Sequence, residues 1–256
     1  MTSPKQQLLD KILYPRQGIW LKDELSIGTE LMSYVPKLRE EFLVQHPEFL
    51  VDDHSQLTPY TARSGPADQQ HLDVYPIKGT GNSPKGFVKN ADTWKIEGIA
   101  YSFPRLNINY APTADIQEKY PTACAITKKY CDHIASYSVI TPQNSIDRHT
   151  GVENEYNKHL RIHIPLIVPE GDIFLECEGV EVTWNDLFGF DNSLVHSAHN
   201  FSDHLRLIFI IDVRRDLLGL PPGLPHDPVR QRLYPPFVRG EKPKRLHPCE
   251  INNELT

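Results

Sequence analysis

The amino-acid sequence predicts a mainly β fold with flanking helices, and three observations support this prediction. Six short segments between residues 135 and 213 are rich in β-branched and aromatic residues and are separated by turn residues. Two of these segments alternate apolar and polar residues with a period of two, as half-buried strands do. Helical spacing of apolar residues occurs in two stretches upstream of these strands, at 23–45 and 121–131. Short strands joined by turns are typical of a sandwich or barrel.

The size and charge of the chain narrow the class of protein. A chain of 256 residues with 39% hydrophobic content can bury one sizeable core. We therefore expect a single domain over residues 1–256, with a helical and loop region at 1–100, a strand-rich core at 101–213 and a proline-rich extension at 214–256. The formal net charge is -6 and the basic residues are scattered, which argues against nucleic acid as a partner. The sequence leaves a homo-oligomer open.

The same sequence features predict where the protein is found. No apolar run approaches the ~18 residues that indicate a membrane span. The four cysteines show no CxxC spacing, and the polar start of the chain lacks the apolar stretch of a signal peptide. These features predict a reduced, cytoplasmic protein that does not bind a membrane.

Two helices are expected before the strands. Residues 23–45 place apolar residues at helical spacing, and Pro36 is expected to break or kink this helix. The apolar positions are Leu31, Val35, Leu38 and Phe42. In the second helix, at 121–131, Pro121 suits a first turn, and the buried face is predicted to consist of Ala123, Ile126 and Tyr130. We expect this helix to cover the β core.

Two regions are predicted to be irregular. Residues 51–90 are rich in proline, glycine, serine and aspartate, so we expect long loops with at most one short strand. Residues 221–256 hold eight of the 22 prolines, a density that prevents regular structure. Apolar residues within this tail suggest that it lies against the body of the protein.

Strand parity singles out the polar residues of the core. The expected strands are 135–141, 159–168, 173–177, 180–184, 187–190 and 205–213. In 159–168, the alternation puts leucine and isoleucine on one face and His159, Arg161 and His163 on the other. In 205–213, Arg206 is the lone charge on its face until Asp212. A buried arginine in such a strand needs an anion.

Two further histidines indicate a metal site. His149 opens a His-Thr-Gly turn, and His196 precedes Arg206 by ten positions. Neutral imidazoles suit first-row transition metals, and an arginine guanidinium forks onto a carboxylate. The combination suggests a metal with an acidic cosubstrate. A zinc hydrolase normally has a third protein ligand and a general base, and Gly151 supplies neither. A non-catalytic jelly-roll binding module has no need of the metal pair together with an inward arginine.

The core also resembles a known family. The ordered pieces, from residue 137 to residue 213, are Tyr137-Ser138-Val139, Arg148-His149-Thr150-Gly151, Asn154, Leu160-Arg161-Ile162-His163-Ile164-Pro165-Leu166, Trp184, Phe190-Asp191-Asn192-Ser193, His196, Asn200, Arg206-Leu207-Ile208 and Asp212-Val213. Together they resemble the catalytic core of the aspartyl/asparaginyl β-hydroxylase family, which consists of iron(II)- and 2-oxoglutarate-dependent oxygenases. The resemblance implies a double-stranded β-helix, also called a jelly-roll or cupin-like fold, within a single catalytic domain.

Carried over position by position, the resemblance assigns roles to six residues. It implies that His149 and His196 are the catalytic iron(II) ligands. It also implies that Ser138 and Arg206 hold the distal carboxylate of 2-oxoglutarate, and that Arg161 and His163 lie beside its C1 carboxylate. The implied activity is a dioxygenase that uses O2 and 2-oxoglutarate to hydroxylate an unactivated C–H bond.

Two positions bear on the reaction and the substrate. A third iron ligand is often a carboxylate two residues after the first histidine, where this chain has Gly151. Iron halogenases share that vacancy, so chlorination is the alternative to hydroxylation. Peptidyl aspartate hydroxylases of this resemblance carry a substrate-binding arginine at the position of His159. The resemblance therefore implies that His159 contacts the substrate here, although imidazole is a poorer partner for a carboxylate. An amino acid, an amino-acid derivative or a related small molecule is therefore our expected substrate, with a peptidyl Asp or Asn residue as the alternative.

Overall fold

The computed structural model describes residues 18–50, 94–103, 108–149, 151, 158–221 and 223. Its strands are β1 (Ile19–Leu21), β2 (Trp94–Phe103), β3 (Ile108–Tyr110), β4 (Cys131–Ile140), β5 (Asn144–His149), β6 (His159–Ile167), β7 (Ile173–Cys177), β8 (Val180–Val182), β9 (Phe188–Phe190), β10 (His196–Asn200) and β11 (Arg206–Arg214). Its helices are α2 (Gly28–Ser33), α3 (Val35–Gln45), α5 (Ala114–Lys119) and α6 (Pro121–Tyr130), with short 3-10 turns at Lys22–Glu24 and Pro47–Leu50. None of the described helices is long and apolar enough to cross a lipid bilayer.

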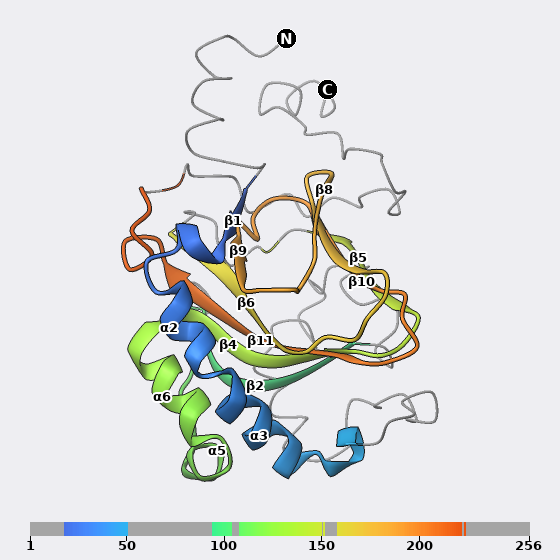
Figure 1. The fold of residues 1–256 in the computed structure, drawn as a ribbon. Helices are drawn as coiled ribbons and strands as arrows, with labels where there is room; N and C mark the ends of the chain where they lie inside the picture. The colour runs from blue at the N-terminus through green and yellow to red at the C-terminus, as the bar shows by residue number, and fades with distance from the viewer. Residues whose placement is uncertain are drawn as a thin grey trace, which may run out of the picture.

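Two antiparallel sheets form the core (Figure 1). The larger sheet has seven strands in the order β1-β9-β6-β11-β4-β2-β3, and the smaller has four in the order β5-β10-β7-β8. All the strand pairs in both sheets are antiparallel. The protein therefore has the mainly β, jelly-roll architecture that the sequence predicts.

The alternation of side chains divides the buried residues into two layers. The outward face of the larger sheet packs against the helices, which lie along it in Figure 1. This layer contains Leu160, Ile162 and Ile164 of β6 together with Leu207 and Phe209 of β11. The inward face meets the smaller sheet in a second cluster. The polar residues of β6 and β11 therefore point into the space between the sheets, as strand parity predicts.

The helices confirm most of the predicted periodicity. The predicted helix at 23–45 is broken at Tyr34, so that Pro36 lies in the first turn of α3, where its missing N–H costs no hydrogen bond. Helix α6 spans nearly the predicted range. Of the predicted apolar face, Leu31, Leu38 and Phe42 are buried, whereas Val35 is half-buried.

The structure adds strands that the sequence patterns do not delimit. Strands β1 and β2 begin within the region expected to hold only helices and loops, and β3, β5 and β10 lie outside the six predicted strands. Strand β2 pairs with β4 over most of its length, so it belongs to the main sheet. The loops predicted at 51–90 and all of the predicted proline-rich tail except Pro221 and Gly223 lie outside the described residues.

Candidate active site

His149 and His196 face each other across neighbouring strands. The two residues are register partners in the β5–β10 ladder. Their ring centroids are 4.2 Å apart and the ring planes are inclined at 56°. His196 is buried and His149 is half-buried. The ring separation suits two imidazoles that share one metal ion.

The surroundings of His196 fix which of its nitrogens is available as a ligand. Its Nδ1 lies 2.8 Å from the carbonyl oxygen of Leu194. Since a carbonyl oxygen only accepts hydrogen bonds, Nδ1 must carry the proton, and Nε2 keeps its lone pair. Burial lowers the pKa of His196 well below its usual range, and the neighbouring His149 lowers it further. The ring is therefore neutral at pH 7, which is the form that binds a metal.

Arg206 supplies a buried positive charge on the inward face of β11. Its side chain is 1% exposed, and no described carboxylate forms an ion pair with it. Its Nε has no hydrogen-bond partner among the described residues. Burial lowers the pKa of the guanidinium to about 9, so it remains charged at neutral pH. An isolated buried charge of this kind is costly, and an anionic ligand would remove much of that cost.

Two residues hold the Arg206 guanidinium in place. Its Nη2 donates a hydrogen bond of 3.3 Å to the Ser138 hydroxyl on β4. Its Cζ lies 4.6 Å from the centre of the Trp184 ring, which makes a cation–π contact. The structure thus brings together Ser138 and Arg206, the two residues to which the resemblance assigns the distal carboxylate. Trp184 is buried and supports the arginine.

His163 lies between the buried arginine and the histidine pair. Its Nδ1 accepts a 3.1 Å hydrogen bond from Trp184 Nε1, so a neutral His163 carries its proton on Nε2. Burial lowers its pKa well below the usual range, and the positive charges of Arg206 and Arg161 add to this effect. Phe190 links it to the histidine pair, because the Phe190 ring centroid lies 5.0 Å from that of His163 and 4.9 Å from that of His196. His163 can therefore donate a hydrogen bond from Nε2 to an anion.

Arg161 and His159 have carboxylate neighbours within the protein. Arg161 binds Asp212 through two parallel hydrogen bonds of 2.9 Å. The His159 ring has Asp132 on one side and Asp212 on the other, at 3.6 Å and 3.7 Å. The structure therefore gives both residues internal partners, and their predicted contacts with the cosubstrate and the substrate remain predictions.

A buried polar network lies on the reverse side of the strands that carry His149 and His196. Arg148 Nε donates to Glu176 Oε2 at 3.1 Å, and the Ser197 hydroxyl donates to the same oxygen at 3.0 Å. His199 continues the network, with its ring nitrogens 2.9 Å from the hydroxyls of Ser197 and Ser145. The network joins β5, β7 and β10, and so it helps to fix the register that sets His149 opposite His196.

The network and a nearby turn hold the segment around His196 in place. His199 is 2% exposed because its two hydrogen bonds and the Phe174 ring enclose it, whereas His204 is exposed. In the turn before His196, the Asp191 carboxylate accepts hydrogen bonds from the backbone N–H and the hydroxyl of Ser193. Gly151 is held there as well, by a backbone hydrogen bond to Asn192.

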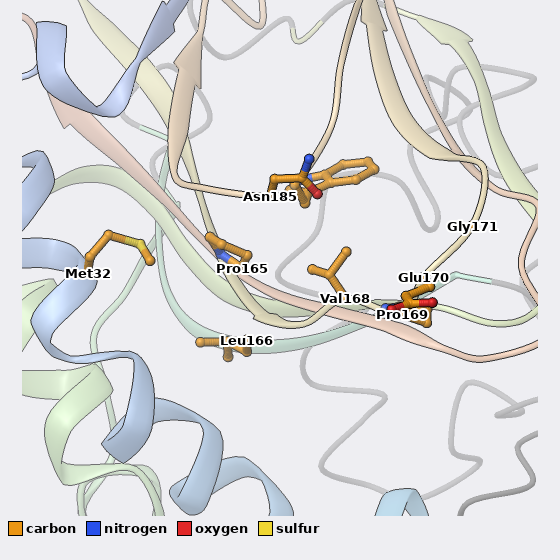
Figure 2. A pocket seen from close by; sticks show the side chains of 9 residues that line it. Met32, Pro165, Leu166, Val168, Pro169, Glu170, Gly171 and Asn185 are labelled. Atoms are coloured by element: carbon orange, nitrogen blue, oxygen red, sulfur yellow. The ribbon is translucent and has the colours of Figure 1, made fainter.

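A separate pocket lies beyond Trp184. It is lined by Met32 of α2, by Pro165 and Leu166 of β6, by residues 168–171 of the β6–β7 connection, and by Trp184 and Asn185 (Figure 2). None of the residues that the sequence assigns to the iron or cosubstrate site lines it. Its main link to the candidate active site is therefore Trp184, which also contacts Arg206 and His163.

Comparison with known proteins gives a family match that covers this site. The sequence profile of the family described as "Aspartyl/Asparaginyl beta-hydroxylase" matches residues 86–216. The aspartyl/asparaginyl beta-hydroxylase of Mus musculus is 30% identical over 101 residues, which cover 36% of this chain and 13% of that protein. The Homo sapiens protein of the same name is 29% identical over 101 residues, with the same coverage. The matched segment thus spans only 13% of the length of these relatives.

Two solved structures show partial likeness to the chain. A predicted oxalate decarboxylase from Thermotoga maritima is 17% identical with a TM-score of 0.27, over 35% of this chain and 71% of that chain. An oxidoreductase of the 2OG-Fe(II) oxygenase family from Burkholderia pseudomallei is 9% identical with a TM-score of 0.31, over 52% of this chain and 71% of that chain. These likenesses are too distant to add to the strand order described above. The profile match covers about half of the chain, including every strand from β2 to β11. The chain therefore belongs to the aspartyl/asparaginyl beta-hydroxylase family.

Proposed function

We propose that the protein is an iron(II)- and 2-oxoglutarate-dependent dioxygenase. It hydroxylates an unactivated C–H bond of an amino acid, an amino-acid derivative or a related small molecule. The observation that carries this proposal is the fully buried Arg206, which no described carboxylate neutralises. A dicarboxylic cosubstrate supplies the missing anion, and the family supports a hydroxylase.

The residues of the site fit iron and the cosubstrate. His196 offers Nε2 because its Nδ1 proton is committed to Leu194, and His149 presents a second imidazole beside it. When bound with 2-oxoglutarate and O2, iron supplies the oxidising power for attack on a C–H bond. Two protein ligands leave several coordination positions open for these partners, since Gly151 has no side chain to fill one.

The chain's own residues bind and orient the cosubstrate in this proposal. Arg206 and the Ser138 hydroxyl hold the distal carboxylate, and Trp184 keeps the guanidinium in place. His163 donates from Nε2 to the carboxylate nearer the iron. The aromatic rings of Trp184, Phe188 and Phe190 surround His163 and exclude water. In this dry environment the charge-assisted hydrogen bonds are stronger than in solution.

The substrate class rests on the residues at the other end of β6. His159 lies between two carboxylates and Arg161 is paired with Asp212, so neither presents a bare cation to an acidic peptide side chain. This arrangement supports a small substrate over a peptidyl aspartate. Because the match covers only 13% of the length of the curated relatives, their activity on aspartyl or asparaginyl residues is for this chain the alternative proposal.

Halogenation is a second candidate, and one observation favours it. Gly151 stands two residues after His149, where a carboxylate ligand often binds. Its backbone N–H donates to the carbonyl oxygen of Asn192, which precedes His196 by four residues. A halide can occupy such a vacant position. Hydroxylation remains our main proposal because the family match extends well beyond the ligands.

A succinate-release screen tests the proposed function. The protein is incubated with iron(II), ascorbate, O2 and 2-oxoglutarate, and free amino acids, their simple derivatives and short acidic peptides are added one at a time. We expect a small molecule to raise succinate release above the background without substrate, and the His196→Ala variant to abolish that increase. A response to acidic peptides alone would favour the peptidyl alternative. Succinate release that is equal in the wild type and in His196→Ala would overturn the proposal.

A further inference from the structure

Three side chains converge at one end of the neighbouring strands β4, β6 and β11 in the larger sheet. The His149–His196 pair lies on β5 and β10 of the other sheet. The converging side chains are His133 of β4, His159 of β6 and Asp212 of β11, and all three are buried. Each offers one nitrogen or oxygen atom, and these atoms lie within 4.8 Å of one another. Two imidazoles and one carboxylate are a common ligand set for first-row transition cations.

The two distances from Asp212 to the histidines match a shared ion better than direct hydrogen bonds. Asp212 Oδ2 is 3.6 Å from His133 Nδ1 and 3.7 Å from His159 Nε2. Hydrogen bonds between such atoms are about 2.7–3.2 Å long. Ligand atoms about 2.1 Å from a tetrahedral zinc ion are about 3.4 Å apart. We propose that His133, His159 and Asp212 form a site for a divalent first-row transition cation such as Zn²⁺, distinct from the iron site.

Groups around the cluster support this assignment. The Asp132 carboxylate lies 3.6 Å from Nδ1 of His159, on the opposite side of the ring from the proposed ligand nitrogen. Carboxylates in that position orient metal-bound imidazoles and raise their basicity. The Asp132 side chain is 35% exposed and contacts His159, so it offers a cation a route from solvent to the cluster.

Arg161 holds the proposed carboxylate ligand and does not exclude a cation. Each Asp212 oxygen accepts one hydrogen bond from Arg161, and a carboxylate oxygen has a second lone pair for a metal. Burial opposes ionisation of Asp212, but Arg161, His159 and His133 together outweigh it and hold the pKa well below the usual range. With neutral imidazoles, the charges of Asp132, Asp212 and Arg161 leave one net negative charge, which attracts a cation.

The site gives His159 a role that differs from a direct substrate contact. Three protein ligands leave a tetrahedral cation one open position. The bound cation, rather than the His159 imidazole, then offers a positive charge to a ligand at this end of the strands. This inference stands whether or not the proposed dioxygenase activity is correct, because it uses none of the iron ligands.

Calorimetric zinc titration of a variant without the iron ligands tests the site. In His149→Ala/His196→Ala, we expect one equivalent of Zn²⁺ to bind. Adding His133→Asn or His159→Asn should abolish that binding, whereas adding His204→Asn, at an exposed histidine, should leave it intact. Adding Asp132→Asn should weaken it on the order of 10- to 100-fold. The proposal would be overturned if His149→Ala/His196→Ala did not bind Zn²⁺, or if binding survived the addition of His133→Asn and of His159→Asn.

Two further measurements exclude a folding artefact. Without metal, His149→Ala/His196→Ala and the same variant with His133→Asn added should melt at similar temperatures. Zn²⁺ should raise the melting temperature only of the variant that keeps His133. Co²⁺ bound in place of Zn²⁺ should show the visible absorption of a tetrahedral site with nitrogen and oxygen ligands. If the two histidines are instead protonated partners of Asp212, neither the Zn²⁺-induced shift nor the Co²⁺ absorption will occur, and the proposal fails. Absence of succinate release from the wild-type protein, together with intact Zn²⁺ binding, would contradict the proposed function alone.

Discussion

His149 and His196 are register partners on antiparallel strands β5 and β10, with their ring centroids 4.2 Å apart. This pairing brings together two residues that are far apart in the sequence. The hydrogen bond between His196 and Leu194 leaves the ligand nitrogen of that ring unprotonated. The site is thus set by strand register together with one backbone carbonyl, and the same barrel carries Arg206 on the facing sheet.

Replacing Arg206 with methionine should separate cosubstrate binding from folding. Because no described carboxylate neutralises Arg206, its removal should not lower the melting temperature of the metal-free protein. The same change should weaken 2-oxoglutarate binding by about 2 to 5 kcal/mol. Binding is measured anaerobically by the shift of melting temperature with 2-oxoglutarate. Arg214→Met, at an exposed arginine of the same strand, is the control. Unaltered cosubstrate affinity in Arg206→Met would refute the assigned role.

The stability of the metal-free protein should fall as the pH drops below about 6.5. The folded protein keeps His163 neutral because its pKa is well below the usual value, whereas the unfolded chain takes up the proton. Protonation of the unfolded chain costs up to about 1.4 kcal/mol of stability per pH unit for each such histidine. His163→Asn keeps an acceptor for Trp184 and removes this titration. Urea unfolding at several pH values should therefore show a shallower slope for the variant. Equal slopes would show that His163 titrates normally.

Glu176→Gln should destabilise the protein through Arg148. Both side chains are 2% exposed, so the variant leaves a buried guanidinium without its counter-charge. Breaking such a pair costs about 3 to 5 kcal/mol. We also expect weaker iron(II) binding, because the network joins the strands that carry both histidines. Chemical unfolding measures the first effect and metal titration the second. Glu181→Gln, on the exposed side of β8, is the control, and equal stability of the two variants would contradict the role of the network.

Turnover in excess chloride should still give an alcohol. The glycine at position 151 permits a halide to bind iron, but we expect hydroxylation as the reaction of this family. Mass spectrometry of the product, once a substrate is known from the succinate screen, distinguishes the two outcomes. A chlorinated product without the alcohol would replace the hydroxylase proposal with a halogenase.

Local patterns predict the parts of the fold that depend on alternation along one strand. The period of two in β6 and β11 assigns each residue to a face, and the observed packing follows that assignment. Leu160 and Phe209 lie in the cluster beneath the helices, whereas Arg206 contacts Ser138 and Trp184. The break at Pro36 follows from its missing N–H in the same local way.

Features that depend on contacts between distant segments are not predictable in this way. Arg161 and Asp212 are 51 residues apart, and only the β6–β11 register shows that they pair. The burial of His199 depends in part on Ser145, which approaches it only when β5 and β10 pair. The second function of Trp184, as a support for Arg206, likewise arises from packing between the sheets. A single sequence carries no direct signal for these contacts.

The most direct test of the account is an anaerobic titration of iron(II) and 2-oxoglutarate into the metal-free protein. Chelation of iron by the keto acid gives a weak visible absorption band. We predict one equivalent of this complex in the wild type, no band in His196→Ala, and a much higher requirement for 2-oxoglutarate in Arg206→Met. A folded wild-type protein that gives no band, or a band of equal strength in His196→Ala, would contradict the assignment of the two histidines as the iron ligands.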